Sequence, residues 1–79
     1  MNTSVTPQNN KTGHDILRHY GESERLCREK ERCKITSVSR TQAWKLEQKG
    51  IFPKRRKIGN TNVWLLSDLL LWISQQEEV

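Results

Sequence analysis

The uneven distribution of apolar residues constrains the fold of this chain more than any other feature. Residues 1–15 hold almost no apolar side chain beyond Met1 and Val5, whereas most of the others fall between Leu26 and Ile73. A chain this short buries only about 60% of the surface that its unfolded form exposes. The three tryptophans matter for such a core, because each can bury roughly 150–250 Å². The sequence therefore predicts a single small domain.

Composition divides the chain into three parts. Residues 1–22 are mostly polar, so we expect a flexible N-terminal tail. Residues 23–75 are expected to form the folded domain, and residues 76–79 a short C-terminal tail. Within the N-terminal tail, a few apolar residues could form a short helix: Ile16, Leu17 and Tyr20.

Positive charge is concentrated in the middle of the chain. From Arg32 to Lys57 there are nine Lys or Arg against one acid, Glu47, a net charge of +8. The remaining residues carry five basic against eight acidic side chains, a net charge of −3. Such a local field favours a polyanionic partner, and nucleic acid is the first candidate.

No targeting or membrane-spanning segment is evident. Residues 1–10 lack the apolar run of a signal peptide. The longest apolar run, Leu69 to Ile73, is far shorter than the roughly 20 residues that span a bilayer. We therefore expect a cytoplasmic protein without a membrane partner.

Two helices are predicted in the centre of the chain. The first covers residues 24–35, with Ser23 as its N-cap, and Thr36 and Ser37 end it. Its thin inward face would hold Leu26, Cys27 and Cys33.

The second predicted helix has a clearer sequence signature. Ser39 is a good N-cap, and Gln42 three residues later completes a capping box. The helix runs over residues 40–49 and ends at Gly50, which suits the position after a helix C-terminus. Two helices joined by so short a turn form a helix-turn-helix pattern, which is a weak signal when taken alone.

A basic β-hairpin and a last helix follow. Residues 54–58 and 63–64 are predicted as strands, joined by a turn of Gly, Asn and Thr residues that suits positive φ. The first strand carries four consecutive cations, and side-chain alternation places two of them on each face. Ser67 is predicted to cap the last helix, with Asp68 in its first turn. One face of this helix would hold Leu69, Trp72 and Ile73.

Catalysis and metal binding have little support in the sequence. Cys27 and Cys33 form neither a Cys-x-x-Cys site nor a disulfide framework, and His14 and His19 lie in or next to the tail. The chain has no Ser/His/Asp set, no paired carboxylates in an apolar setting and no Gly-rich phosphate loop. We expect a non-enzymatic protein without a cofactor, a metal ion or a small-molecule substrate.

An ordered series of motifs covers about two-thirds of the chain. Its pieces are Val38-Ser39-Arg40-Thr41, Gly50-x-Phe52-Pro53-Lys54, a basic stretch to Ile58-Gly59, Trp64, Ser67-Asp68-Leu69 and Trp72-Ile73. With these residues the segment from about Leu26 to Gln75 resembles the AlpA family of phage and mobile-element regulators, which are related to excisionases and to the winged-helix part of the MerR group. The resemblance implies a mainly α fold with a small β-hairpin, a winged helix-turn-helix. It also implies a bacterial, nucleoid-associated protein.

The resemblance, together with helix-turn-helix geometry, defines the predicted DNA-binding residues. The N-terminal residues of the second helix would contact base edges in the major groove. The predicted recognition-helix residues are Ser39, Arg40, Thr41, Gln42, Trp44 and Lys45. The predicted wing residues are Lys54, Arg55, Arg56, Lys57, Asn60 and Asn62. Trp44 could donate to a phosphate or simply pack, whereas Phe52, Trp64 and Trp72 are expected in the core and away from DNA.

The sequence departs from the family pattern in four places. Ser37 stands where the turn usually has Gly, which suggests a strained or slightly different turn. Arg32 replaces a buried aliphatic residue and Arg56 an apolar wing residue, so these two either extend the cationic surface or shift the register. The fourth departure is a set of leucines where the family is usually polar: Leu65, Leu66 and Leu70.

The three leucines predict a second surface. If they are exposed, a contiguous apolar patch on so small a domain indicates an interface, either for self-association or for another protein. The alternative is that the N-terminal segment with Ile16, Leu17 and Tyr20 covers them.

Three functions remain open at this point. The first is an architectural recombination factor, or excisionase, that binds adjacent DNA sites, with an integrase or recombinase as a candidate partner and self-association on DNA. The second is a transcriptional regulator of a prophage or mobile element. The third is a protein-interaction adaptor that uses the leucine patch and does not bind DNA.

Overall fold

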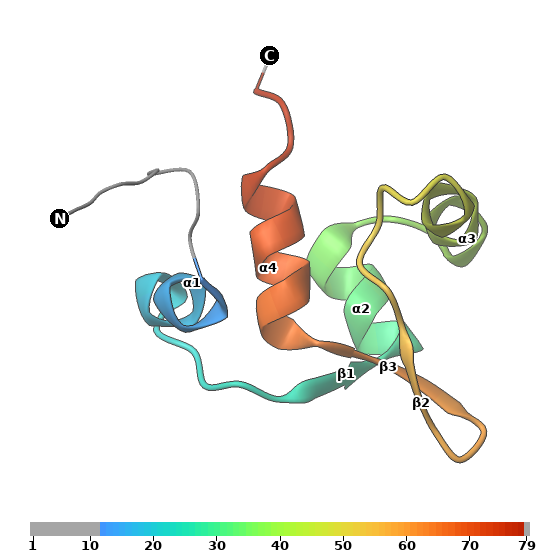
Figure 1. Cartoon of the computed structure of the whole chain (residues 1–79), viewed down its shortest axis with the longest axis horizontal. Helices are drawn as coiled ribbons and strands as arrows, with labels where there is room; N and C mark the ends of the chain where they lie inside the picture. The colour runs from blue at the N-terminus through green and yellow to red at the C-terminus, as the bar shows by residue number, and fades with distance from the viewer. Residues whose placement is uncertain (1–11, 79) are drawn as a thin grey trace, which may run out of the picture.

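The structure of the chain is a computed structural model that describes residues 12–78. Within that range four short helices lie to one side of a small three-stranded sheet (Figure 1). In chain order the elements are α1 (Gly13–Tyr20), β1 (Leu26–Arg28), α2 (Glu29–Thr36), α3 (Arg40–Gln48), β2 (Arg56–Ile58), β3 (Thr61–Leu65) and α4 (Leu66–Ser74). The expectation of a flexible tail falls mainly on residues 1–11, which lie outside the described residues, as does residue 79.

The sheet is antiparallel, with β3 in its centre and β1 and β2 at its edges. Cys27 is paired with Trp64, and Lys57 with Asn62. Because side chains alternate along a strand, these residues share the face that looks toward the helices. Arg56, which is paired with Val63, lies on the opposite face.

The core lies where α4 meets the sheet and its neighbouring helices. Figure 1 shows α4 standing between α1 and α2, and both helices contact it. Leu69 of α4 and Cys27 of β1 are fully buried, and Phe52 fills the space next to Trp64. The expectation that Phe52 and Trp64 are core residues is confirmed, and Trp72 packs partly buried against the same cluster.

The predicted first helix begins too early in the chain. Residues 26–28 form the edge strand β1, and α2 starts only at Glu29, so Ser23 caps no helix. Of the three residues expected to face inward, only Cys27 is buried, whereas Leu26 and Cys33 are exposed. A three-residue strand has no detectable periodicity of its own, and pairing with β3 is what defines it.

The prediction of an exposed leucine patch was wrong. Leu66 is 2% exposed and Leu70 is 9% exposed, because α1 packs across α4 and covers them with Ile16 and Leu17. The alternative expectation, contact with the N-terminal segment, describes the structure. A short helix in this segment is therefore present, and it contributes to the core. Of the predicted patch only Leu65 is partly exposed.

Ser67 does not cap α4. The helix begins one residue earlier, at Leu66, and Ser67 lies inside its first turn. Its backbone N–H donates to Glu24 at 3.1 Å, and its hydroxyl donates to the same carboxylate at 2.6 Å. A carboxylate distant in sequence thus supplies the cap that Leu65 cannot, and Asp68 lies in the first turn as expected.

The helix pair itself is confirmed. Ser37 ends α2 in the left-handed region with φ of 61°, the strained turn expected where the family usually has Gly. The Ser39 hydroxyl then accepts from the backbone N–H of Gln42 at 3.2 Å and caps α3. Gly50 follows α3 with φ of 74°. With the β2–β3 hairpin beside this helix pair, the fold is a winged helix-turn-helix.

Candidate nucleic-acid interface

One face of α3 is open to solvent over its whole length. Ala43 is buried and Leu46 partly buried, and these two side chains hold the helix on the core. All six predicted recognition-helix residues lie on the exposed part of this segment: Ser39, Arg40, Thr41, Gln42, Trp44 and Lys45. Trp44 is 53% exposed, a large fraction for an indole. A cationic, polar helix face with an exposed aromatic ring is thus presented to solvent.

The four wing cations are divided between two sides of the hairpin. Lys54, Arg55 and Lys57 border a hollow alongside the C-terminal half of α3. Arg56 points from the opposite face of the sheet, where a separate hollow is lined by Arg28 and Ile58 among others. Only three of the four predicted wing cations are therefore placed beside the recognition helix.

The turn of the hairpin consists of Gly59 and Asn60, with φ of 63° at Gly59. Asn60 is exposed at the tip, whereas Asn62 lies within β3 and faces α3. The two asparagines predicted as wing contacts thus occupy different environments.

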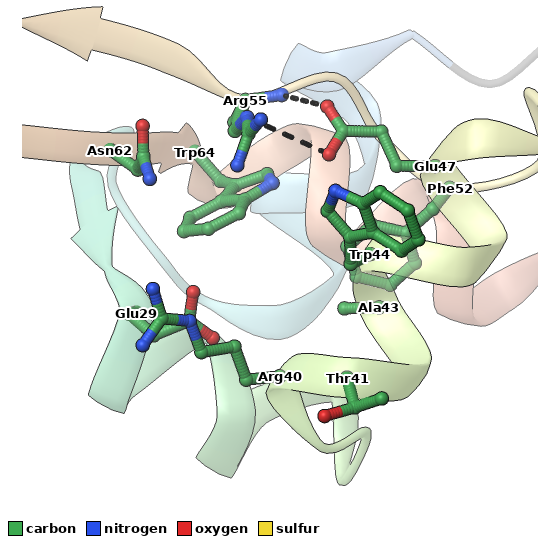
Figure 2. Close-up of a pocket in the computed structure, with 10 residues that line it drawn as sticks. All are labelled: Glu29, Arg40, Thr41, Ala43, Trp44, Glu47, Phe52, Arg55, Asn62 and Trp64. Carbon is green, nitrogen blue, oxygen red and sulfur yellow. Dashed lines mark hydrogen bonds and ion pairs between the residues drawn. The ribbon is translucent and has the colours of Figure 1, made fainter.

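A cleft of about 610 Å³ separates α3 from the wing. Figure 2 shows its walls: Arg40, Trp44 and Glu47 from α3 on one side, Asn62 and Trp64 from β3 on the other. Arg55 closes the upper end, where its backbone N–H and side chain both contact the Glu47 carboxylate, at 3.5 and 3.7 Å. The predicted helix and wing residues therefore meet around one concave site.

A buried arginine, Arg32, packs against two of the aromatic residues that line this cleft. Arg32 is fully buried, so it does not extend the cationic surface, in contrast to one of the two outcomes expected for it. Its guanidinium lies 5.7 Å from the centre of the Phe52 ring and 5.5 Å from that of Trp64, in cation–π range. It also donates to the Val38 carbonyl at 2.5 Å and forms an ion pair with Glu29. The other eight cations between residues 32 and 57 are all exposed.

Arg32 links the turn of the helix pair to the wing. Val38 immediately precedes the Ser39 cap of α3, and Trp64 lies in the central strand of the wing. The Thr36 hydroxyl, which accepts from Arg32 at 3.2 Å, adds a further contact next to the strained turn. One buried side chain thus contacts both the segment that leads into α3 and the central strand of the hairpin.

Potential metal ligands and the two cysteines were the other candidates for chemistry in this chain. Within residues 12–78 no three His, Cys, Asp or Glu side chains are grouped as metal ligands would be. Burial, with Glu31 nearby, raises the pKa of the Cys27 thiol, so that cysteine stays in its unreactive neutral form. None of the helices described is long and apolar enough to cross a membrane.

Fold and site together define a class, the winged helix-turn-helix proteins with a basic recognition helix and wing. Residues 25–77 match the family model described as prophage CP4-57 regulatory protein (AlpA). This match covers well over half of the chain, which therefore belongs to the AlpA family of prophage regulatory proteins, a regulatory family and not an enzyme family. No curated protein and no solved structure matched the chain. Helix α1 lies outside the matched segment.

Sequence reasoning missed Glu29, Glu47 and Trp64 as parts of the cleft. The signal that could have placed Trp64 there is strand alternation, because Asn62 and Trp64 are two residues apart and share a face of β3. The two glutamates sit on helices and approach the cleft only through the packing of those helices, so local sequence carries no sign of them.

Proposed function

We propose that this chain is a sequence-specific double-stranded DNA-binding protein of a prophage or mobile element, which acts as an excisionase, a transcriptional regulator or both. The observation that carries the proposal is the convergence of an exposed recognition-helix face and three wing cations on one cleft. Membership of a prophage regulatory family supports the same function.

The N-terminal turn of α3 is suited to read bases. Arg40 and Gln42 are exposed at the end of the helix that enters the major groove in proteins of this class. Arginine can pair with guanine O6 and N7, and glutamine with adenine N6 and N7, each adding about 1–3 kcal/mol of discrimination. These two side chains are therefore the proposed determinants of sequence preference.

The wing is suited to hold the sugar–phosphate backbone. Lys54, Arg55 and Lys57 lie on the side of α3, and contacts from such cations fix register without reading sequence. Arg56, on the other face of the hairpin, is not part of this proposed contact.

A protein-interaction adaptor without DNA binding is the competing class. It depended on an exposed leucine patch, and two of the three leucines are buried under α1. The other exposed large apolar side chains are Tyr20, Leu26, Trp44, Ile51 and Ile58, of which Leu26 and Ile58 line one hollow on the outer face of the sheet. Because the predicted leucine patch itself is not exposed, the adaptor function has lost its main support.

A footprint on the DNA that flanks the gene for this chain tests the proposal. Several adjacent protected sites, filled cooperatively, indicate an excisionase that self-associates on DNA and works with an integrase. One protected site over a promoter indicates a transcriptional regulator. If no site is protected at any salt concentration, DNA binding is contradicted and the adaptor function is favoured.

The division of labour between helix and wing has its own test. We expect Arg40→Ala and Gln42→Ala to reduce the preference for the footprinted site over a random duplex by about tenfold each. Lys57→Ala should weaken binding to both duplexes equally, since a phosphate contact is independent of sequence. Equal losses on both duplexes for all three variants would contradict base reading by α3.

A further inference from the structure

A buried hydrogen-bond donor in the cleft has no partner. Trp64 is 3% exposed, and its indole Nε1 donates to no acceptor within residues 12–78. Trp72 shows the usual arrangement, because its Nε1 donates to the Ile51 carbonyl at 2.7 Å. Most buried donors in folded proteins are paired, because an unpaired one loses its hydrogen bonds to water without replacement. The Trp64 donor is thus an exception that requires an acceptor.

We propose that the cleft between α3 and the wing holds one phosphate group of the DNA backbone, with the Trp64 indole N–H donating to a non-bridging phosphate oxygen. This inference rests on the proposed DNA-binding function and adds to it a defined phosphate site. It also revises the expectation that Trp64 stays away from DNA.

The geometry of the cleft supports a ligand between the two tryptophans. In Figure 2 the nitrogen edge of Trp64 faces the side of the cleft where Trp44 and Glu47 lie, and the nitrogen of Trp44 faces back toward it. Trp44, which flanks the opening, is largely exposed and can turn outward without breaking the core. An incoming oxygen atom can therefore reach the buried donor.

The charges around the cleft favour an anion. Glu29 is paired with Arg32 and Glu47 with Arg55, so both carboxylates are offset by a neighbouring cation. Arg40 lines the same cleft and forms no ion pair within the described part of the chain. The balance of charge at the site is therefore positive, as a phosphodiester requires.

A second unpaired polar atom lies beside the first. The Asn62 Oδ1 atom is buried and accepts no hydrogen bond from any described residue. The oxygen and nitrogen of an amide group have nearly the same outline, so a half-turn of the group places two N–H donors where the acceptor stands. Asn62 can then donate to the same phosphate as Trp64.

The position of the cleft identifies the source of the phosphate. With α3 in the major groove, the wing lies over an adjacent strand, and the space between helix and wing is where a sugar–phosphate chain passes. A free inorganic phosphate gains only the contacts within the cleft, whereas a backbone phosphate belongs to a strand that the wing cations Lys54 and Lys57 also hold.

The indole N–H signals of the full-length, ¹⁵N-labelled chain test the proposal directly. They are followed by NMR while a duplex that carries the footprinted site is added, with inorganic phosphate added in a parallel titration. We expect the Trp64 proton to move downfield with the duplex, as it gains an anionic acceptor. The Trp72 proton is the internal control and should stay in place, because it is already bonded to Ile51.

A chemical substitution isolates the hydrogen bond itself. Replacing Trp64 by benzothienylalanine puts sulfur in place of the N–H and keeps the ring size, and ligation at Cys33 allows the full chain to be assembled. Loss of a hydrogen bond to a charged group should weaken binding by about tenfold or more. A neutral methylphosphonate at the contacted phosphate should weaken the wild type more than the variant, which has already lost the Trp64 contact.

Several results would overturn the proposal. An unmoved Trp64 proton in the saturated complex, or unchanged affinity of the benzothienyl variant, excludes the contact. A Trp64 proton that responds to Glu47→Gln but not to DNA shows that Glu47 is the acceptor. A shift with inorganic phosphate alone shows that the site binds a free ion. A wild-type chain that binds no duplex overturns the proposed DNA-binding function as well. This result differs from unchanged affinity of the benzothienyl variant, which overturns the Trp64 contact alone.

Discussion

Arg32 shows how much of this small domain depends on a single buried charge. Its guanidinium stacks on Phe52 and Trp64, and its donors hold the turn that leads into α3. Its Nε atom has no partner among the described residues, and only Glu29, itself partly exposed, neutralises it. Burying a charge in this way contributes little net stability and serves mainly to fix geometry, by the general behaviour of buried ion pairs.

This view of Arg32 predicts different outcomes for two substitutions. Arg32→Ala leaves a cavity under two aromatic rings and an unpaired Val38 carbonyl, so we expect the free energy of unfolding to fall by about 3–5 kcal/mol. Arg32→Met fills most of the space and should cost less than about 1.5 kcal/mol. Thermal and urea unfolding followed by circular dichroism measure both values.

DNA binding by the Met variant separates stability from positioning. If Arg32 fixes the angle between α3 and the wing, Arg32→Met should stay folded and yet lose sequence preference. A Met variant as unstable as the Ala variant would show instead that the ion pair and hydrogen bonds dominate stability. Lys34→Met is the matched control, because Lys34 is an exposed cation of the same helix.

Glu24 is the second residue whose role depends on charge. Its partial burial alone would raise its pKa, but the two hydrogen bonds that it accepts from Ser67 outweigh this effect, so that the pKa lies below its ordinary value of 4.5. A carboxyl group whose folded pKa is lowered stabilises the fold above its unfolded pKa. That contribution is lost as the pH falls through the folded pKa.

We therefore predict a pH-dependent effect of Glu24→Ala. At neutral pH the variant should lose about 1 kcal/mol of unfolding free energy, as for the loss of a helix N-cap. The difference from the wild type should shrink below pH 4.5, where the wild-type carboxylate itself becomes protonated. Urea titrations across this range measure it, with Glu22→Ala as the control. A difference that does not change with pH would contradict the charged cap.

Among the helices and strands, α1 departs most from the domain expected from the sequence, because it belongs to the folded core. It lies outside the family match and is separated from β1 by a short connection, yet Ile16 is 1% exposed and Leu17 is 8% exposed. Thr12 caps the helix by accepting from the backbone N–H of Asp15, and Gly21 ends it in the left-handed region. The helix thus has its own start and stop signals and supplies core side chains.

The packing of α1 on α4 predicts a large cost for truncating its buried face. Ile16→Ala should lower the free energy of unfolding by about 2–4 kcal/mol, because it removes core volume next to Leu66 and Leu70. Tyr20→Ala on the same helix should change it by less than about 0.5 kcal/mol, since that side chain is exposed. If both variants match the wild type in urea unfolding, α1 is not docked in solution.

For the whole molecule, the parts predicted from sequence are those with local signals. The Ser39 cap, the glycine after α3 and the presence of a hairpin follow from short-range rules, whereas the class of fold was implied by the resemblance to the AlpA family. The turn is shorter than predicted, because β3 begins at Thr61 and leaves only Gly59 and Asn60 between the strands. The strand β1 could not be predicted, because three residues become a strand only through pairing with β3. The recognition-helix and wing residues could be proposed from their places in the sequence. That Arg56 faces away from α3 could not, because it depends on the register between β2 and β3.

Arg55, Arg56 and Lys57 carry the same charge and are adjacent in sequence, so charge alone cannot tell which of them face α3. The strand register decides this, because it places Arg56 on the opposite face of the hairpin. If phosphates are bound on the α3 side of the wing, each contact releases condensed counterions and adds about 0.9 to the magnitude of the slope of log K against log salt. Arg55→Ala and Lys57→Ala should therefore each lower the slope by about one.

Arg56→Ala is the matched control, since it removes the same charge from the opposite face and should leave the slope nearly unchanged. Fluorescence anisotropy over a range of salt concentrations measures all three variants. Equal reductions for all three would mean that the wing acts as a diffuse charge and that its orientation toward α3 has no part in binding.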